Sequence, residues 1–420
     1  MKLIGPFKQL LPMSGLPLRG ALRDTQLPVL ENAGILVADG RIVEIGSFRK
    51  LYETAKDNNT DVYLLEGDQM ALPGFVDAHT HICYGGSRAA DYAQRNAGKT
   101  YLEIAAAGGG IWDTVSRTRE SSQQELVAGI LARAGRHLSE GVTTMEVKSG
   151  YGLSVKEELK MLYAIREAAE QLAADLIPSC LAAHIVPKDF GGTAADYLRE
   201  LSTGLLPKLK EEGLCRRVDA FIEKTAFSAT DIAPYFKEAK RLGFDLTVHA
   251  DQFTTGGSGV AIEFEALSAD HLEASTRVEI EKLAKSRVIA TALPGASIGL
   301  GCNFSPARAL LDAGSALAIA SDWNPGSAPM GRLLTQAAIL GAFEKLTNAE
   351  VLAGITFRAA AALNLADRGS LEEGKLADLV VFPTNDYREI LYQQGSLRPE
   401  SVWKEGCCVF SAPVNQTTMH

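Results

Sequence analysis

Eight apolar, β-rich runs separated by helical stretches occupy the middle of the chain and restrict the folds open to it. The runs are LPGFVDAH (72–79), GVTTMEV (141–147), DLIPSCLAAH (175–184), RVDAFIEK (217–224), FDLTVHA (244–250), ALSADHL (266–272), RVIATALPG (287–295) and SALAIASD (315–322). Helical stretches at 155–173, 193–212, 228–242 and 330–346 lie between or after them. Repeated βα units are typical of a parallel sheet, and eight of them in about 290 residues fit a (β/α)8 barrel.

Short β-rich runs also occur near both ends of the chain. GILVADGRIVEIG (34–46) has a hairpin signal at Asp39-Gly40, and GKLADLVVF (374–382) and SVWKEGCCVF (401–410) are broken by glycine. A chain of 420 residues exceeds the size of a single hydrophobic core. We therefore expect an α/β protein with a composite β-sandwich from residues 1–70 and 366–420, and a distorted (β/α)8 TIM-type barrel from 71–365 inserted into it. The long first connection, 82–140, predicts a functional loop or a lid.

Composition excludes several classes of protein. The net charge of −9 leaves no basic surface for duplex nucleic acid. No window has the roughly 18 to 20 uninterrupted apolar residues that a membrane span requires. The N-terminal segment lacks the pattern of a signal peptide, and the six dispersed cysteines suit reduced thiols. We expect a cytoplasmic enzyme with neither nucleic-acid nor membrane partners.

Ionisable residues recur at the ends of the predicted strands, where a barrel of this type carries its chemistry. They are His79, His81, His184, Glu223, His249, His271 and Asp322. Of the seven histidines only His137, in a helical stretch, and His420, at the terminus, fall elsewhere. We expect these two to be exposed and without function.

Four of these residues suggest a metal centre. Residues two apart on a strand share a face, so His79 and His81 can offer two imidazole nitrogens to one cation. An isolated HxH is more often structural. His249 and Asp322 add the nitrogen and oxygen ligands that zinc or iron prefers, which favours a metal.

The motifs also carry a family resemblance. PGFVDAHTH (73–81), with His249, His271 and SDWNPGS (321–327), resembles the amidohydrolase superfamily. A narrower set resembles the branch that hydrolyses 4-imidazolone-5-propanoate to N-formimidoyl-L-glutamate in histidine degradation. That set is GGSR (85–88), YLEIAAAGGGI (101–111), EVKSGYGL (146–153), AAHIVP (182–187), HADQ (249–252), SADHLE (268–273) and DWNPGSAP (322–329). The resemblance spans residues 30–410.

The resemblance implies roles for individual residues. One zinc or iron ion per chain would be held by His79, His81, His249 and Asp322, and the pocket for a small substrate with a carboxylate tail would be lined by Arg88, Tyr151, His184, Gln252, Asn324, Gly326 and Ser327. Some members have glutamate where this chain has Gln252, so a mechanism with that residue as a base does not apply here. We also expect a homodimer.

The expected chemistry is metal-assisted opening of a cyclic amide. A metal with an open position lowers the pKa of bound water towards roughly 7. Asp322 would accept the water proton and pass it to the leaving nitrogen, with His271 holding or sharing it, and His184 would donate to the amide carbonyl. Arg88 offers a planar fork to the propanoate carboxylate, and the turn Asn324–Ser327 offers further donors.

Three other interpretations stay open from the sequence. A binuclear amidohydrolase needs a carbamylated lysine, for which Lys148 and Lys224 are available. A ring deaminase would use the same metal ligands. A non-catalytic protein could retain the barrel, although an intact ligand set argues against that. The glycines at 108–110 lack the context of a nucleotide-binding loop.

Overall fold

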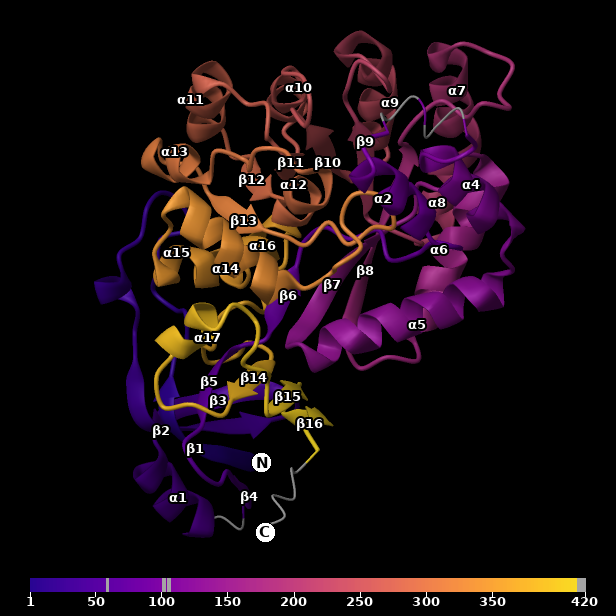
Figure 1. Cartoon of the computed structure of the whole chain (residues 1–420). Coiled ribbons are helices and arrows are strands. Elements are labelled where there is room, and N and C mark those ends of the chain that lie inside the picture. The colour runs from indigo at the N-terminus through magenta and orange to yellow at the C-terminus, as the bar shows by residue number, and fades with distance from the viewer. Residues whose placement is uncertain (58–59, 100–102, 104–106, 414–420) are drawn as a thin grey trace.

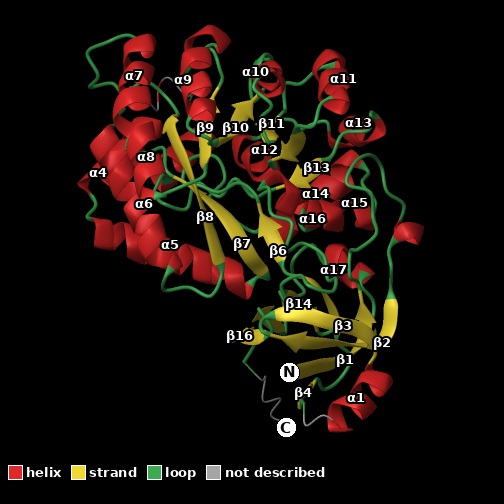
Figure 2. Cartoon of the chain, turned by 180° about the vertical axis from the view of Figure 1, so that it is seen from behind, coloured by secondary structure: helices red, strands yellow, loops and turns green. Residues whose placement is uncertain are grey.

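The computed structural model describes residues 1–57, 60–99, 103 and 107–413. Two sheets dominate it, each of eight strands. In Figure 1 the parallel sheet and its helices fill the upper part, while the other sheet lies below and joins the two ends of the chain, indigo and yellow. The view from behind in Figure 2 shows the same division.

The parallel sheet contains one strand from each of the eight predicted runs. The strands are β6 (Phe75–Asp77), β7 (Val142–Lys148), β8 (Asp175–Ala183), β9 (Arg217–Phe221), β10 (Asp245–Ala250), β11 (Ser268–His271), β12 (Ile289–Ala292) and β13 (Leu317–Ile319). They pair in sequence order, each parallel to the next. Most of their residues are buried, because the strands are covered on both faces. The barrel prediction is confirmed.

Helices follow the strands and cover the outside of the barrel (Figures 1 and 2). They are α5 (Gln123–Ser139), α6 (Val155–Ala169), α7 (Ala194–Glu200), α8 (Leu206–Glu212), α9 (Ala229–Arg241), α10 (Gly257–Glu263), α11 (Arg277–Lys285), α12 (Pro294–Leu300), α13 (Ala307–Asp312), α14 (Leu333–Glu344), α15 (Asn348–Gly354) and α16 (Phe357–Ala362). Side-chain N-caps such as Ser122, Ser154 and Ser228 fix where several begin. A short π-helix, Leu201–Leu205, separates α7 from α8.

The barrel closes at a seam between its first and last strands. No ladder joins β6 to β13. Instead Asp322 N–H donates to the His79 carbonyl at 3.0 Å, and His81 N–H donates to the Trp323 carbonyl at 2.9 Å. The seam is therefore formed by the segments that carry three of the four predicted metal ligands.

The second sheet draws strands from both termini. Its order is β16 (Cys407–Ser411), β15 (Ser401–Lys404), β14 (Leu379–Phe382), β5 (Met70–Pro73), β1 (Lys2–Leu10), β2 (Leu30–Ala38) and β3 (Arg41–Ser47), with β4 (Asp61–Leu64) also paired to β1. The predicted hairpin turn is present, since Asp39 and Gly40 have φ of 49° and 76°. The short helices η1 (Asp24–Gln26), α1 (Phe48–Asp57) and α17 (Arg388–Tyr392) complete the terminal segments.

One segment connects the two sheets directly. Only Gly74 separates β5 in the terminal sheet from β6 in the barrel. A Cβ atom at Gly74 would lie 2.3 Å from the Thr143 hydroxyl oxygen, so a larger residue does not fit there. The terminal sheet is thus joined through a single residue to the strand that leads into His79 and His81.

The first connection of the barrel holds helices of its own. They are α2 (Ala89–Asn96), α4 (Ile111–Glu120) and α5. Part of the motif at 101–111 lies outside the described residues. Among the residues that the structure describes, no helix combines the length and apolar character of a membrane span.

Candidate active site

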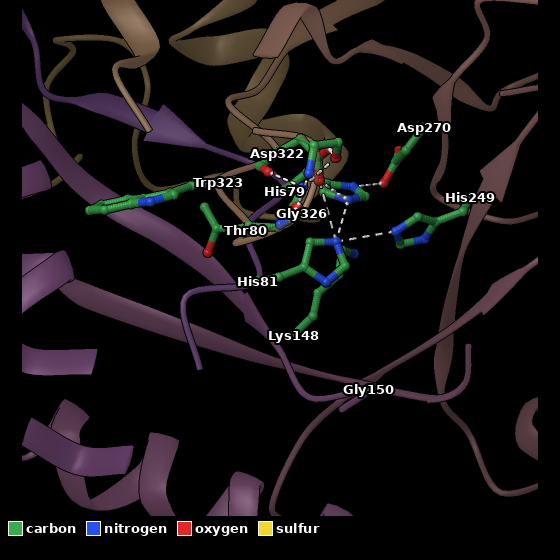
Figure 3. A network of polar contacts seen from close by, with 12 residues as sticks. His79, Thr80, His81, Lys148, Gly150, His249, Asp270, Asp322, Trp323 and Gly326 are labelled. Atoms are coloured by element: carbon green, nitrogen blue, oxygen red, sulfur yellow. Dashed lines mark hydrogen bonds and ion pairs between the residues drawn. The ribbon is translucent and has the colours of Figure 1, made fainter. Parts of the chain in front are cut away.

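Four predicted ligands converge at the carboxyl end of the barrel. His79 and His81 follow β6, His249 lies in β10 and Asp322 follows β13. The Nε2 atom of His81 lies 3.1 Å from Nε2 of His79 and 3.3 Å from Nε2 of His249 (Figure 3). Asp322 Oδ1 lies 3.5 Å and 3.4 Å from the Nε2 atoms of His79 and His81. All four side chains are buried.

Two buried carboxylates decide where the imidazole protons lie. Asp270 Oδ2 lies 2.7 Å from Nδ1 of His79, and Asp219 Oδ2 lies 3.0 Å from Nδ1 of His249. Burial lowers the pKa of His79 well below its usual value and that of His249 to about 4, so both rings are neutral. Asp270 accepts the Nδ1 proton of His79, which leaves the Nε2 lone pair of His79 directed at the other ligands, and the charge of Asp219 favours a proton on Nδ1 of His249.

This arrangement fits a metal ion. Nε2 of His81 lies 3.1 Å from Nε2 of His79 and 3.3 Å from Nε2 of His249, separations at which one cation could bind all three nitrogens. Nitrogen and oxygen ligands of a tetrahedral ion with bonds of about 2.0–2.1 Å lie about 3.3–3.4 Å apart, close to the separations observed. Two overlapping groups, His79 with His249 and His271, and His79 with His81 and Asp322, have donor atoms within 4.8 Å of one another.

The buried charges below the histidines also call for a cation. Lys148 Nζ contacts Glu146 Oε2 and Asp219 Oδ2, each at 2.7 Å, and Arg217 Nε contacts Glu146 Oε1 at 3.3 Å. The ion pairs of Asp270 and Asp322 among the described residues are with His79 and His81 and not with a lysine or arginine. The two cations thus balance only two of the four carboxylates, and a divalent ion would balance the other two.

Neither lysine considered for a binuclear centre is placed for it. Burial alone lowers the pKa of Lys148, but Asp219 and Glu146 raise it above its usual value, so the amine stays protonated. A protonated amine has no lone pair to form a carbamate. Lys224 is exposed. The geometry favours a mononuclear centre.

His271 lies beside the four ligands in a strained conformation. Its ring centroid is 5.4 Å from that of His249 and 5.9 Å from that of His79. Its Nδ1 atom faces Glu273 Oε1 at 3.4 Å. His271 and Asp322 have φ of 87° and 51°, a region that costs non-glycine residues on the order of 1–3 kcal/mol each. Such strain is typical of functional sites.

Tyr151 and His184 line one side of the centre. Their rings lie 5.6 Å apart, and each ring centroid is 5.9 Å from that of His81. His184 Nδ1–H donates to the Gly150 carbonyl at 2.9 Å, and burial lowers the pKa of His184 to about 3. The neutral ring therefore has a lone pair on Nε2, which accepts hydrogen bonds. This tautomer does not support the expected role of His184 as a donor to the amide carbonyl.

Arg88 lies against the turn that follows Asp322. Its Nε–H donates to Asp91 at 2.5 Å, and its Nη1 lies 3.5 Å from the position of a Cβ atom on Gly326. Asn324 Oδ1 accepts the N–H groups of Gly326 and Ser327, each at 2.8 Å. The Ser327 hydroxyl reaches Asp322 Oδ2 at 3.3 Å. The turn thus connects Arg88 to Asp322.

Two other strand-end residues lie on loops. Gln252 is half-buried on the turn that follows β10, next to Asp251, which has φ of 52°. The Glu223 carboxylate accepts the N–H groups of Phe253 and Thr254 at 3.0 Å each, so it shapes this turn. It is not a member of either group of possible metal ligands.

The expectation that His137 is exposed is wrong. The residue is fully buried, its Nε2 lies 2.9 Å from Asp77 Oδ2, and its ring packs on Trp323 with centroids 4.8 Å apart. The face of α5 that carries His137 packs towards the barrel. Burying an imidazole there without a hydrogen-bond partner would cost free energy, and Asp77 provides that partner. His420 lies outside the described residues.

The sequence reasoning did not single out the residues that support the ligands. Asp219, Asp270 and Glu146 are acids within the β-rich runs RVDAF, SADH and VTTMEVK. An acid on a strand buried on both faces needs a charged or hydrogen-bonding partner. A buried acid on such a strand therefore indicates a residue that holds a neighbouring histidine or cation in place.

Comparisons with known proteins agree with the fold. The Amidohydrolase family matches residues 70–409. Imidazolonepropionase of Pseudomonas paraeruginosa is 41% identical over 91% of this chain and 94% of its own length, and that of Bdellovibrio bacteriovorus is 39% identical over 93% and 91%. Atrazine chlorohydrolase of Arthrobacter aurescens, solved with zinc, has a TM-score of 0.71 at 16% identity over 99% of this chain and 97% of its own. An adenosine deaminase of Xanthomonas campestris with bound zinc has a TM-score of 0.66 at 19% identity, over 97% and 92%.

These findings define the class of the protein. The chain belongs to the amidohydrolase family and is a hydrolase. Within that family its relatives place it among the imidazolonepropionases. The solved structures are too distant in sequence to add more than the fold.

Proposed function

We propose that this chain hydrolyses the cyclic amide of 4-imidazolone-5-propanoate to N-formimidoyl-L-glutamate, a step of histidine degradation. The observation that carries this proposal is that two features meet at one end of the barrel. The four convergent side chains suit a hydrolytic metal, and Arg88 lies against the turn that begins at Asp322. A carboxylate tail bound by Arg88 would thus lie beside the reacting group.

One zinc or iron ion held by His79, His81, His249 and Asp322 is part of the proposal. When bound, such an ion acts as a Lewis acid and makes water nucleophilic at neutral pH. The protein's own contribution is to keep the imidazoles neutral through burial and to direct their Nε2 atoms inwards through Asp219 and Asp270.

Asp322 and His271 are proposed to move the proton. Burial raises the pKa of Asp322, but His81, His271 and His249 lower it by more, so the net shift of the pKa is downward and the carboxylate is ionised, with a lone pair to accept a proton. Water oxygen adds to the carbonyl carbon, the carbon–nitrogen bond of the ring breaks, and the water proton passes through Asp322 to the leaving nitrogen. His271 shares the proton during the transfer.

The remaining pocket residues are proposed to orient the substrate. Burial raises the pKa of Tyr151, so its hydroxyl stays protonated and donates. His184 Nε2 accepts from a ring N–H, consistent with the tautomer set by Gly150. Arg88, Asn324, Gly326 and Ser327 hold the propanoate end of the substrate, and Gln252 lines the pocket.

A direct assay tests the proposal. Purified protein is mixed with 4-imidazolone-5-propanoate, and we expect loss of the ring's ultraviolet absorbance together with formation of N-formimidoyl-L-glutamate. Release of ammonia from an aminated ring compound, with no action on the imidazolone, would favour the deaminase alternative. No action on either would leave the barrel as a non-catalytic scaffold.

The metal content gives a second prediction. We expect one tightly bound transition-metal ion per chain, because the four ligands complete one centre and the buried lysine is not available to bridge a second ion. Elemental analysis of active protein measures the ratio and identifies the metal. Two ions per chain would overturn the mononuclear proposal, and active protein without metal would overturn the mechanism.

Arg88→Lys is expected to weaken substrate binding more than it alters metal content. Lysine keeps the charge but loses the planar fork that matches a carboxylate. Loss of one charge-assisted hydrogen bond costs about 1.5–3 kcal/mol, so kcat/KM should fall at least about tenfold. Steady-state kinetics and elemental analysis on the same samples separate the two effects.

An analogue without the propanoate tail provides the control. The parent and the Arg88→Lys variant should both turn it over poorly and at similar rates. If the variant discriminates between the two compounds as strongly as the parent does, the tail is held elsewhere, and the turn Asn324–Ser327 becomes the leading candidate.

The assembly and location of the protein remain predictions. We propose a cytoplasmic homodimer that acts on a small molecule and has no nucleic-acid or membrane partner. Light scattering on the purified protein measures the molar mass, for which twice 44.9 kDa is expected. A monomeric mass for active enzyme would overturn the dimer.

A further inference from the structure

Glu158 is a buried carboxylate outside the chemistry described so far. It lies near the start of α6, and its side chain is fully buried. Its oxygens accept three backbone N–H groups, from Gly150 at 2.9 Å, Gly152 at 2.8 Å and Leu153 at 2.7 Å. Burial raises the pKa of Glu158, and these three donors act against that rise because they bind the ionised form.

The three donors belong to the loop that carries Tyr151, between β7 and α6. This loop has an unfavourable backbone: Gly150 has φ of 106°, and Leu153 has φ of 49° although it has a side chain. A Cβ atom at Gly152 would lie 2.5 Å from the backbone of Glu157, so the loop passes very close to the helix. Such a shape persists only where surrounding contacts impose it, and the Glu158 carboxylate supplies three of them.

The same loop determines the proton position on His184. The N–H of Gly150 is bound by Glu158, and the carbonyl of Gly150 accepts Nδ1–H of His184 at 2.9 Å. The loop is therefore anchored to Glu158 on one side and orients an imidazole of the pocket on the other.

We propose that Glu158 is a positioning residue that sets the place of Tyr151 and, through Gly150, the orientation and tautomer of His184. A single buried side chain on a helix thus aligns two groups that face the substrate. The catalytic consequence rests on the proposed function. The effect on the His184 tautomer does not.

Glu158→Gln tests this with a minimal change of shape. Both carboxylate oxygens accept in the parent, and an amide replaces one of them with an NH2 group, which meets a backbone N–H. We expect kcat/KM for 4-imidazolone-5-propanoate to fall at least about tenfold, with metal content unchanged. Glu157→Gln is the matched control, because Glu157 adjoins it in the same helix but pairs with Lys160 at 2.6 Å. The control should stay within about twofold of the parent.

A double-mutant cycle separates positioning from general loss of stability. If Glu158 acts largely through His184, Glu158→Gln should cost much less activity in a His184→Asn background than in the parent. Equal losses in the two backgrounds would overturn the connection to His184.

Imidazole nitrogen resonances of resting, 15N-histidine-labelled protein give a readout that needs no substrate. We expect His184, assigned by the signal missing in His184→Asn, to carry its proton on Nδ1 in the parent and to show a changed tautomer mixture in Glu158→Gln. An unchanged tautomer in the folded variant would overturn the proposal. If the parent does not act on the imidazolone, the proposed function fails, yet the tautomer still decides the role of Glu158.

A milder variant covers the case in which Glu158→Gln does not fold. Glu158→Asp keeps both acceptor oxygens but shortens the side chain, so it should show a smaller change in tautomer and a smaller loss of kcat/KM. If Glu158→Gln does not fold, parental values for both the tautomer and kcat/KM in folded Glu158→Asp would overturn the proposal.

Discussion

Asp322→Asn should lower kcat on the order of 10² to 10⁴-fold while the barrel stays folded. The side-chain amide keeps the size of the carboxylate but cannot accept the water proton. The backbone of residue 322 would still donate to the His79 carbonyl, so the barrel seam should survive. Steady-state kinetics, circular dichroism and elemental analysis on one preparation measure turnover, fold and metal content together.

The control for this variant is Asp312→Asn. Asp312 is largely exposed and pairs with Arg308 at the end of α13, so its loss should leave kcat nearly unchanged. Substantial turnover by Asp322→Asn at parental metal content would show that Asp322 is not the proton carrier. His271 would then become the leading candidate.

Lys148→Met should lower the free energy of unfolding by about 3–5 kcal/mol. The ammonium group is fully buried between Glu146 and Asp219, and its removal leaves two carboxylates without their shared cation. Since Asp219 also contacts Nδ1 of His249, we expect weaker metal binding as well. Denaturant unfolding measures the first effect, and competition with a chelator measures the second.

Lys156→Met serves as the comparison, because Lys156 is 90% exposed and its substitution should change stability by no more than about 0.5 kcal/mol.

A carbamylated lysine would make activity depend on bicarbonate, whereas the ion-paired ammonium of Lys148 predicts no such dependence. Stability of Lys148→Met within about 1 kcal/mol of the parent would contradict the ionised network described here.

The strands could be predicted because their signal is local. Each buried strand of a parallel sheet is a short apolar run, and the helical stretches between them are long enough to be distinguished. The same regularity predicts that four residues at strand ends lie together at one end of the barrel: His79, His81, His249 and Asp322. The hairpin at Asp39-Gly40 was equally local, since both turn residues need positive φ.

The partners of these residues could not be predicted, because they depend on which distant side chains meet. His137 lies on α5, and only the packed fold shows that its side chain pairs with Asp77. The proton position on His184 depends on one carbonyl, that of Gly150, on another strand's loop. Glu223 also lies at the end of a strand, but its carboxylate accepts the backbone N–H groups of Phe253 and Thr254. Sequence position alone does not separate these cases.

The single residue between β5 and β6 has a consequence for the order of events during synthesis. β5 is held in the terminal sheet by β1 on one side and by β14 on the other, with Leu72 opposite Val380. The strand that leads to His79 and His81 therefore reaches its final support only when residues beyond 379 have left the ribosome. Pairings this distant along the chain form slowly. A nascent chain halted before β14 would carry all four candidate metal ligands and still lack a finished scaffold for the first two.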